Sequence, residues 1–204
     1  MAIPAQTTIT LHNESKIKAA PGTLLDALQR RHTSREFSEE QLCERHLSQI
    51  LWAAYGVNRP DGHRTAPAAM GIYALRIYAV TEKGIFLYHP AANELIEVLS
   101  GDFRGYAGKQ DFVKTAPLNL IVYADYNAFR TGDPNVDNIM VGHEARMAAL
   151  DAGAAAENVY LYCASEGINV VERMLFDSTT FAGIMGLPKS YNFMLAMTAG
   201  YPCE

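Results

Sequence analysis

The stretch RRHTSREF, residues 30–37, places three arginines, one histidine and two hydroxyl side chains within eight residues of an otherwise acidic chain. Arginine offers a planar fork that matches two phosphate oxygens, and serine or threonine adds a short hydrogen bond to the same group. The stretch therefore predicts a site for a compact phosphate. The alternative is a solvated helix end, where positive charge suits the helix dipole.

Helices are predicted on both sides of this stretch. Thr23 can cap a short helix that ends at the arginines. Ser38 and Gln41 have the spacing of a capping box for the next helix, which Gly56 can end. Residues 57–66 (VNRPDGHRTA) contain turn-forming residues and no apolar period, which indicates a loop.

Short runs of β-branched, aromatic and apolar residues predict the strands. The predicted strands are 73–80, 85–88, 94–99, 118–124, 168–171 and 192–200. Because only short turns separate the first three of these strands, we expect them to form a small antiparallel meander. The run 118–124 (LNLIVYA) is nearly all apolar and predicts a central strand covered on both faces.

The remaining helices follow from spacing and caps. We expect helices over 101–115 and 141–166, the second of them ended by Gly167. We also expect a helix from a cap at Asp177 through Met185, and a loop over 126–135. In the longest helix, residues 151–156 (DAGAAA) are unusually small, so another helix can approach closely. This helix is expected either at the centre of the domain or at a dimer seam.

The composition fits one α+β domain over residues 1–204, in which 1–20 form an extended arm. With 17 Lys and Arg against 22 Asp and Glu, the net charge is -5, so nucleic acid is not an expected partner. Three scattered cysteines argue against a disulfide framework. No apolar run could span a membrane, and we expect a cytoplasmic protein; a chain whose export signal had been removed would give the same pattern.

Motifs for several kinds of catalysis are absent from the sequence. No G-x-G-x-x-G follows a strand, no H-E-x-x-H occurs, and no G-x-S-x-G surrounds a serine. No metal site is expected, and Cys163 in an apolar helix is interpreted as an inert core thiol. The chemistry is then expected to come from a bound cofactor.

Several stretches resemble one family over nearly the whole chain. RHTSREF (31–37), LWAAYGVNR (51–59) and RTAPAAMGIY (64–73) are similar to motifs of the FMN-dependent nitroreductase superfamily, and within it of the SagB-type dehydrogenase branch. DAGAAAEN (151–158) resembles the D-A-G-x-A-x-Q-N signature of that family's central helix. The resemblance implies a nitroreductase-like fold, a mostly antiparallel sheet flanked by helices, in a homodimer with FMN at the interface.

The resemblance also implies which residues bind the cofactor. It implies no catalytic residue in the protein, because the chemistry takes place on the flavin. The phosphate and ribityl chain of FMN would be held by Arg31, His32, Thr33 and Arg35. A loop from the neighbouring subunit would add Pro67, Ala68, Ala69 and Gly71. Because Ala68 stands where the family has serine, any contact there would be through backbone or apolar atoms.

The segment VVERMLFD (170–177) occupies the place where the family's backbone amides face flavin N5. This adds Arg173, Met174 and Leu175 to the expected cofactor-binding residues. Arg173 could stabilise the anionic reduced flavin, or it could be a surface arginine. The chain stops at Glu204 without the basic residues that often add a phosphate contact.

The leading hypothesis is an FMN oxidoreductase that passes electrons from NAD(P)H to a small acceptor, such as a nitroaromatic or a quinone, by a ping-pong mechanism. A second hypothesis is an azoline oxidase acting on a peptide heterocycle. Such relatives carry a Lys-Tyr pair before the central helix, whereas this chain has FRTG (129–132) and VGHE (141–144). A third is a flavin-binding protein without turnover.

Overall fold

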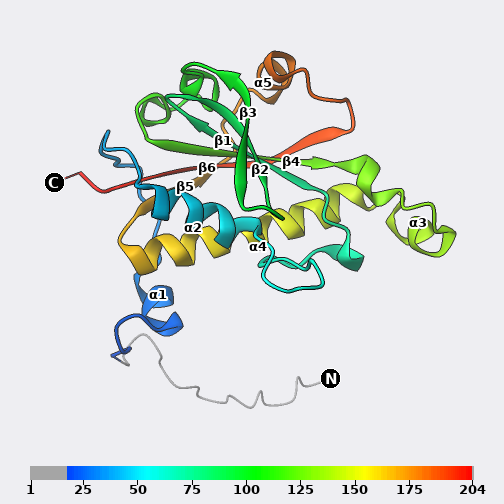
Figure 1. The fold of residues 1–204 in the computed structure, drawn as a ribbon, viewed down its shortest axis with the longest axis horizontal. Coiled ribbons are helices and arrows are strands. Elements are labelled where there is room, and N and C mark those ends of the chain that lie inside the picture. Colours follow the sequence, from blue (N-terminus) through cyan, green and yellow to red (C-terminus); the bar gives the residue numbers. More distant parts are fainter. Residues whose placement is uncertain (1–17, 204) are drawn as a thin grey trace, which may run out of the picture.

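The computed structural model describes residues 18–203, so the expected extended arm over residues 1–20 lies almost wholly outside them. An antiparallel sheet runs through the molecule in the order β3-β2-β1-β4-β6-β5 (Figure 1). The strands are β1 (Leu75–Thr81), β2 (Gly84–His89), β3 (Glu94–Ser100), β4 (Leu118–Asp125), β5 (Asn169–Arg173) and β6 (Tyr191–Gly200). Each predicted strand is confirmed, with ends that differ by no more than a few residues.

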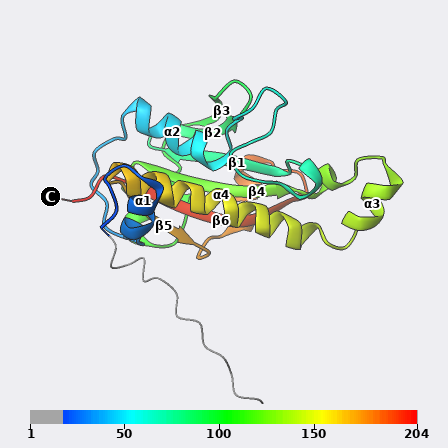
Figure 2. The same ribbon diagram turned by 90° about the horizontal axis from the view of Figure 1, so that it is seen from below.

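Helices flank the sheet, as the fold class α+β requires. They are α1 (Leu24–Arg30), α2 (Glu44–Tyr55), α3 (Pro134–Met140), α4 (Glu144–Glu166) and α5 (Ser178–Met185). Short 3₁₀ turns are η2 (Ala69–Gly71), η3 (Arg104–Tyr106), η4 (Asp111–Lys114) and η5 (Tyr126–Phe129). Figure 2 shows α4 lying along one face of the sheet, with α2 and α1 beside it.

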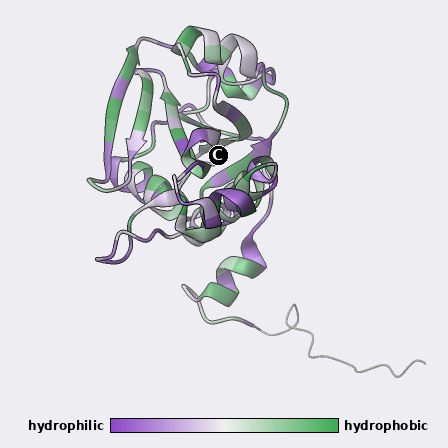
Figure 3. Ribbon diagram, turned by 90° about the vertical axis from the view of Figure 1, so that its right-hand side faces the viewer, coloured by the Kyte–Doolittle hydropathy of each residue, from purple (hydrophilic) through white to green (hydrophobic). Residues whose placement is uncertain are grey.

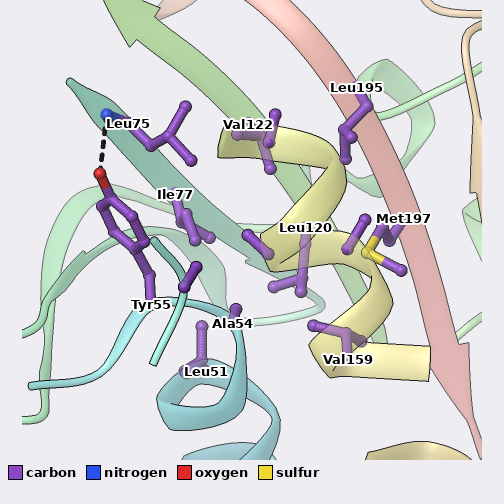
Figure 4. Close-up of a cluster of buried hydrophobic side chains, with 14 of the residues drawn as sticks. Leu51, Ala54, Tyr55, Leu75, Ile77, Leu120, Val122, Val159, Leu195 and Met197 are labelled. Carbon is purple, nitrogen blue, oxygen red and sulfur yellow. Dashed lines mark hydrogen bonds between the residues drawn. The ribbon is translucent and has the colours of Figure 1, made fainter. Parts of the chain in front are cut away.

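The core between α4, α2 and the sheet is built from small helix residues and large strand residues. Ala152, Ala155 and Ala156 of α4 are fully buried, which lets the helix lie close to the strands. In Figure 4 side chains of β1, β4 and β6 meet those of α2 and α4. The hydroxyl of Tyr55 accepts a hydrogen bond from the backbone N–H of Leu75 at 3.3 Å, which ties α2 to the start of β1.

The opposite face of the sheet has a second, aromatic core. Tyr123 of β4 stacks on Phe181 of α5 at 6.3 Å between ring centroids. Its hydroxyl donates to the Ser178 carbonyl at 3.0 Å. Helix α5 thus closes this face, and β4 is covered on both sides as its apolar sequence predicted.

The predicted caps at three helix ends are confirmed. Thr23 accepts a hydrogen bond from the Asp26 backbone, and Asp177 accepts one from the Thr180 backbone. Gly167 ends α4 with φ 71, a left-handed conformation that favours glycine. Helix α1 stands out from the body of the fold (Figure 3), and Leu24 on it is 65% exposed.

The predicted helix over 101–115 is wrong. The segment forms only η3 and η4, because glycines interrupt it. Gly101 has φ 113, and a Cβ at Gly108 would overlap the guanidinium of Arg173. The segment therefore bends to follow the sheet.

Three further boundaries are wrong. The predicted capping box at Ser38 does not start α2, because the Ser38 backbone N–H bonds the carbonyl of Tyr201 at 2.9 Å and keeps the chain extended as far as Cys43. The predicted loop over 126–135 contains η5 and the start of α3, whose N-cap is Asp133 followed by Pro134 at the first turn. The long helix starts at Glu144 rather than Val141.

Candidate anion-binding site beside the end of β5

The 31–38 segment runs beside the outer edge of β5. The backbone N–H of Ser34 donates to the carbonyl of Val170 at 3.0 Å, and the side chain of Asn169 donates to the carbonyl of Glu36 at 2.7 Å. Phe37 is buried and packs against Phe112. These contacts fix the backbone that carries the arginines.

The three arginines of this stretch have different partners. Arg30 is paired with Asp26 at 2.7 Å, one helical turn away. The guanidinium groups of Arg31 and Arg35 form no hydrogen bond or ion pair with any residue of the described range 18–203. Because Arg35, His32 and Thr33 are exposed as well, two free cations and a hydroxyl are available to an anion.

Tyr160 of α4 joins this segment to the end of β5, a role that no sequence motif indicated. Its hydroxyl lies 3.1 Å from Thr33 Oγ1 and accepts the backbone N–H of Glu172 at 2.8 Å. The Arg31 guanidinium lies over its ring, 5.3 Å from the centroid. A single tyrosine thus sets the positions of the 31–33 backbone and of the segment that follows β5.

The segment after β5 exposes its apolar side chains. Met174 is 62% and Leu175 is 55% exposed. The carbonyl of Leu175 accepts the backbone N–H of Lys109 at 3.3 Å. This edge therefore combines apolar surface with the cations of the 31–35 segment.

The side chain of Arg173 turns into the protein and is 6% exposed, so it is not a surface arginine. Its guanidinium donates to Thr198 Oγ1 at 2.9 Å, to the Ala107 carbonyl at 2.6 Å and to Asn119 Oδ1 at 2.9 Å. Burial lowers the pKa of Arg173 to about 10, so the group stays charged at neutral pH. Within the described residues no carboxylate pairs with it.

The loop of Pro67, Ala68, Ala69 and Gly71 contacts a different part of α4 from the arginine segment. The backbone N–H of Ala69 donates to the buried carboxylate of Asp151, at 3.3 Å and 3.4 Å from the two oxygens. Met70 and Gly71 both have positive φ, which turns the backbone outward. Burial raises the pKa of Asp151 to about 6.

Two groups of expected site residues are therefore held at two places on one helix. Asp151 anchors the loop and Tyr160 anchors the arginine segment, and nine residues of helix separate them, a rise of about 14 Å. Within one chain, the loop and the arginine segment are thus anchored at different turns of α4.

Other kinds of site are not evident in the described part of the chain. Among residues 18–203 no group of three or more His, Cys, Asp or Glu could hold a metal ion. Cys43, Cys163 and Cys203 are free thiols, and burial raises the pKa of Cys163. Within the same range no helix is both long and apolar enough to cross a bilayer.

The fold and this edge define an α+β protein with a candidate anion-binding site beside the end of β5. The sequence pattern of the nitroreductase family matches residues 28–201. A provisionally named nitroreductase of Methanocaldococcus jannaschii is 31% identical over 183 residues, covering 84% of this chain and 88% of that protein. A provisionally named nitroreductase from Ralstonia eutropha, solved by crystallography, is 33% identical with a TM-score of 0.80, covering 92% of this chain and 87% of that one.

A more distant structure, a provisionally named nitroreductase in complex with FMN from Desulfovibrio desulfuricans, is 17% identical with a TM-score of 0.62, covering 89% of this chain and 87% of that one. At this identity it shows the shared fold. The chain belongs to the nitroreductase family, a family of flavin oxidoreductases.

Proposed function

We propose that the protein is an FMN-dependent oxidoreductase that takes electrons from NAD(P)H and delivers them to a small acceptor, such as a nitroaromatic or a quinone. The observation that carries the proposal is the pair of free guanidinium groups, Arg31 and Arg35, held beside the end of β5 in a member of this family. FMN bears one terminal phosphate, which suits two arginines and a hydroxyl.

The residues of the site divide between binding and tuning. Arg31, His32, Thr33 and Arg35 would hold the phosphate and ribityl chain, and the exposed segment of Met174 and Leu175 would face the ring. When bound, FMN supplies the two-electron chemistry, so no protein acid or base is needed at the centre. Arg173, a buried charge without a carboxylate partner, would favour an anionic reduced flavin from within the protein.

We propose that the active form is a homodimer with two equivalent sites. The loop of Pro67, Ala68, Ala69 and Gly71 would then serve the FMN of the neighbouring subunit. The separation of this loop from the arginine segment along α4 supports this arrangement. Exposed apolar side chains on α4 and on the elements that contact it support the arrangement too. They are Leu24 and Leu28 of α1, Trp52 of α2, Met70 of η2 and Leu150 of α4.

The azoline-oxidase hypothesis has less support. The stretch before α4 carries Phe129, which is buried, and a turn in which Asp137 accepts hydrogen bonds from Thr131. The Lys-Tyr pair of those enzymes has no counterpart there. A flavin-binding protein without turnover differs from our proposal only in its kinetics.

The experiment is anaerobic stopped-flow mixing of the FMN-loaded protein with NADH, NADPH or a heterocyclised peptide. We expect NADH or NADPH to bleach the flavin, the reduced form to persist until a quinone is added, and steady-state kinetics to be ping-pong. Bleaching by the peptide alone would establish the azoline-oxidase alternative. Failure of both nicotinamides to bleach the flavin would refute the proposed donor.

A further inference from the structure

A second cationic cavity lies away from the β5 edge. It has a volume of about 390 Å³ and opens between the loop after α2 and the strands β1 and β2. Arg64, Arg76, Tyr73 and Tyr88 line it together with apolar side chains. The arginines and the apolar segment at the β5 edge are not part of its wall, so it is a separate site.

Arg64 is the central group of this cavity. Its guanidinium lies between two aromatic rings, 4.1 Å from the centroid of Tyr55 and 4.5 Å from that of Tyr73. Tyr55 in turn is fixed to Leu75, which also lines the cavity (Figure 4). The rings hold the guanidinium plane in place without using its N–H donors.

Those donors have no acceptor within residues 18–203. The side chain of Arg64 makes neither a hydrogen bond nor an ion pair there, and its Nε is buried without a partner. Buried donors in folded proteins are nearly always paired, so the unpaired Nε marks Arg64 as a side chain whose hydrogen-bonding capacity the protein leaves unused. Burial lowers the pKa of Arg64, but an arginine remains charged at neutral pH.

Arg76 adds a second positive charge that is only partly compensated. Its Nη2 lies 3.7 Å from Asp125 Oδ2, and its Nη1 donates to three backbone carbonyls at the start of β1. Two guanidinium groups therefore face one carboxylate, and the cavity has an excess of positive charge. In a chain of net charge -5 this excess is local.

We propose that this cavity binds a small organic carboxylate. The carboxylate would accept hydrogen bonds from the two Nη groups of Arg64, which have no acceptor among residues 18–203. The apolar body of the ligand would lie against Leu75 and Leu87. Inorganic phosphate fits less well, because a bulkier dianion would leave this apolar wall uncovered. The proposal does not depend on the proposed oxidoreductase function.

The experiment is calorimetric titration of the FMN-loaded protein with cyclohexanecarboxylate, a carboxylate that is not aromatic and so does not stack on a flavin. Cyclohexylmethanol is the neutral probe of similar shape, and inorganic phosphate is the second anion. We expect saturable binding of the carboxylate, at least about tenfold tighter than that of either other probe. Equal binding of the alcohol or of phosphate would overturn the proposal, as would no binding of the carboxylate.

Variants locate the binding. R64Q and R76Q are each expected to weaken carboxylate binding by about tenfold or more, whereas R64K keeps the charge without the fork and is expected to weaken it less than R64Q. R59Q is the matched control, since Arg59 lies on the same loop, is 54% exposed and forms an ion pair with Asp61 at 4.0 Å. Flavin absorbance reports folding of each variant. If R64Q does not fold, R64K and R76Q decide, and wild-type affinity in both would refute the site.

Discussion

Three arginines within six residues differ sharply in what they are free to do. Arg30 is neutralised by Asp26, whereas the guanidinium of Arg35 is exposed and has no partner among residues 18–203. We expect R35A to weaken FMN binding by roughly ten- to a hundredfold, since a charge-assisted hydrogen bond contributes about 1.5–3 kcal/mol. Fluorescence titration of the flavin measures this, and R30A is the matched control. Equal losses in the two variants would contradict the assignment.

The hydroxyl of Tyr160 connects two segments, because it bonds both Thr33 and the backbone of Glu172. Y160F would leave the Glu172 N–H without its acceptor and would remove the bond to Thr33. We expect a loss of about 1–3 kcal/mol in the free energy of unfolding, together with weaker FMN binding. Urea denaturation measures the first. Y162F is the control, because that hydroxyl donates to Gln49 at the surface. A similar loss there would argue against a special role for Tyr160.

Individual residues were predictable where their chemistry alone defined a role. The charge and hydroxyl pattern of residues 31–35 predicted a phosphate site, and the family resemblance implied that the phosphate belongs to FMN. Tyr160 could not be found in this way, because a lone tyrosine on a helix is indistinguishable from a core residue until β5 is placed beside it. The burial of Arg173 was hidden for a similar reason, since its partners come from β4, β6 and the segment between β3 and β4.

Among the elements, α4 and the 67–71 loop are joined by a carboxylate with a raised pKa. Below its unfolded pKa of 3.8 Asp151 is protonated in both states, and its stabilising contribution is lost as pH rises through about 6. D151N keeps an acceptor for the Ala69 N–H without the buried charge. We therefore expect D151N to melt above wild type at neutral pH, with the difference vanishing below about pH 4.

Asp137 provides a control of opposite sign. Hydrogen bonds from the Thr131 backbone and side chain lower the pKa of Asp137, so its contribution is present at neutral pH and is lost on acidification. D137N should melt below wild type at neutral pH and match it at low pH. Thermal melts across the pH range measure both variants, and the same sign for both would contradict the burial argument.

Secondary structure was predictable where a single local signal dominated. Apolar runs marked β4 and β6, and Thr23, Asp177 and Gly167 marked helix ends. The prediction failed where tertiary contacts decide. Residues 101–115 contain three glycines, which weaken a helix, and the segment also contacts the buried guanidinium of Arg173 at Ala107 and Gly108, which the sequence does not reveal. The Asp133-Pro134 start of α3 was a local signal that the loop assignment overlooked.

At the scale of the whole molecule, the exposed side of α4 and the elements packed beside it, α1, α2 and η2, carry apolar side chains that a single chain does not cover. Leu150 of α4 is 65% exposed beside buried neighbours. If this face forms the dimer, L150E should give monomers and release FMN, because a charge would be buried at the seam. Light scattering and flavin absorbance measure this. I96E is the control, since Ile96 on β3 is 48% exposed and remote from α4. Monomers in both variants, or in neither, would refute a dimer interface at Leu150.

The contacts of the 31–38 segment also protect the sheet from self-association. β5 is an edge strand, and its outward carbonyl at Val170 and N–H at Glu172 are satisfied by Ser34 and by Tyr160. An open strand edge is a template for pairing with another chain. If an anion on Arg31 and Arg35 holds this segment down, protein starved of flavin should lose protection of the Ser34 amide in hydrogen exchange and aggregate sooner. Cofactor supply would then set the solubility of the protein as well as its activity.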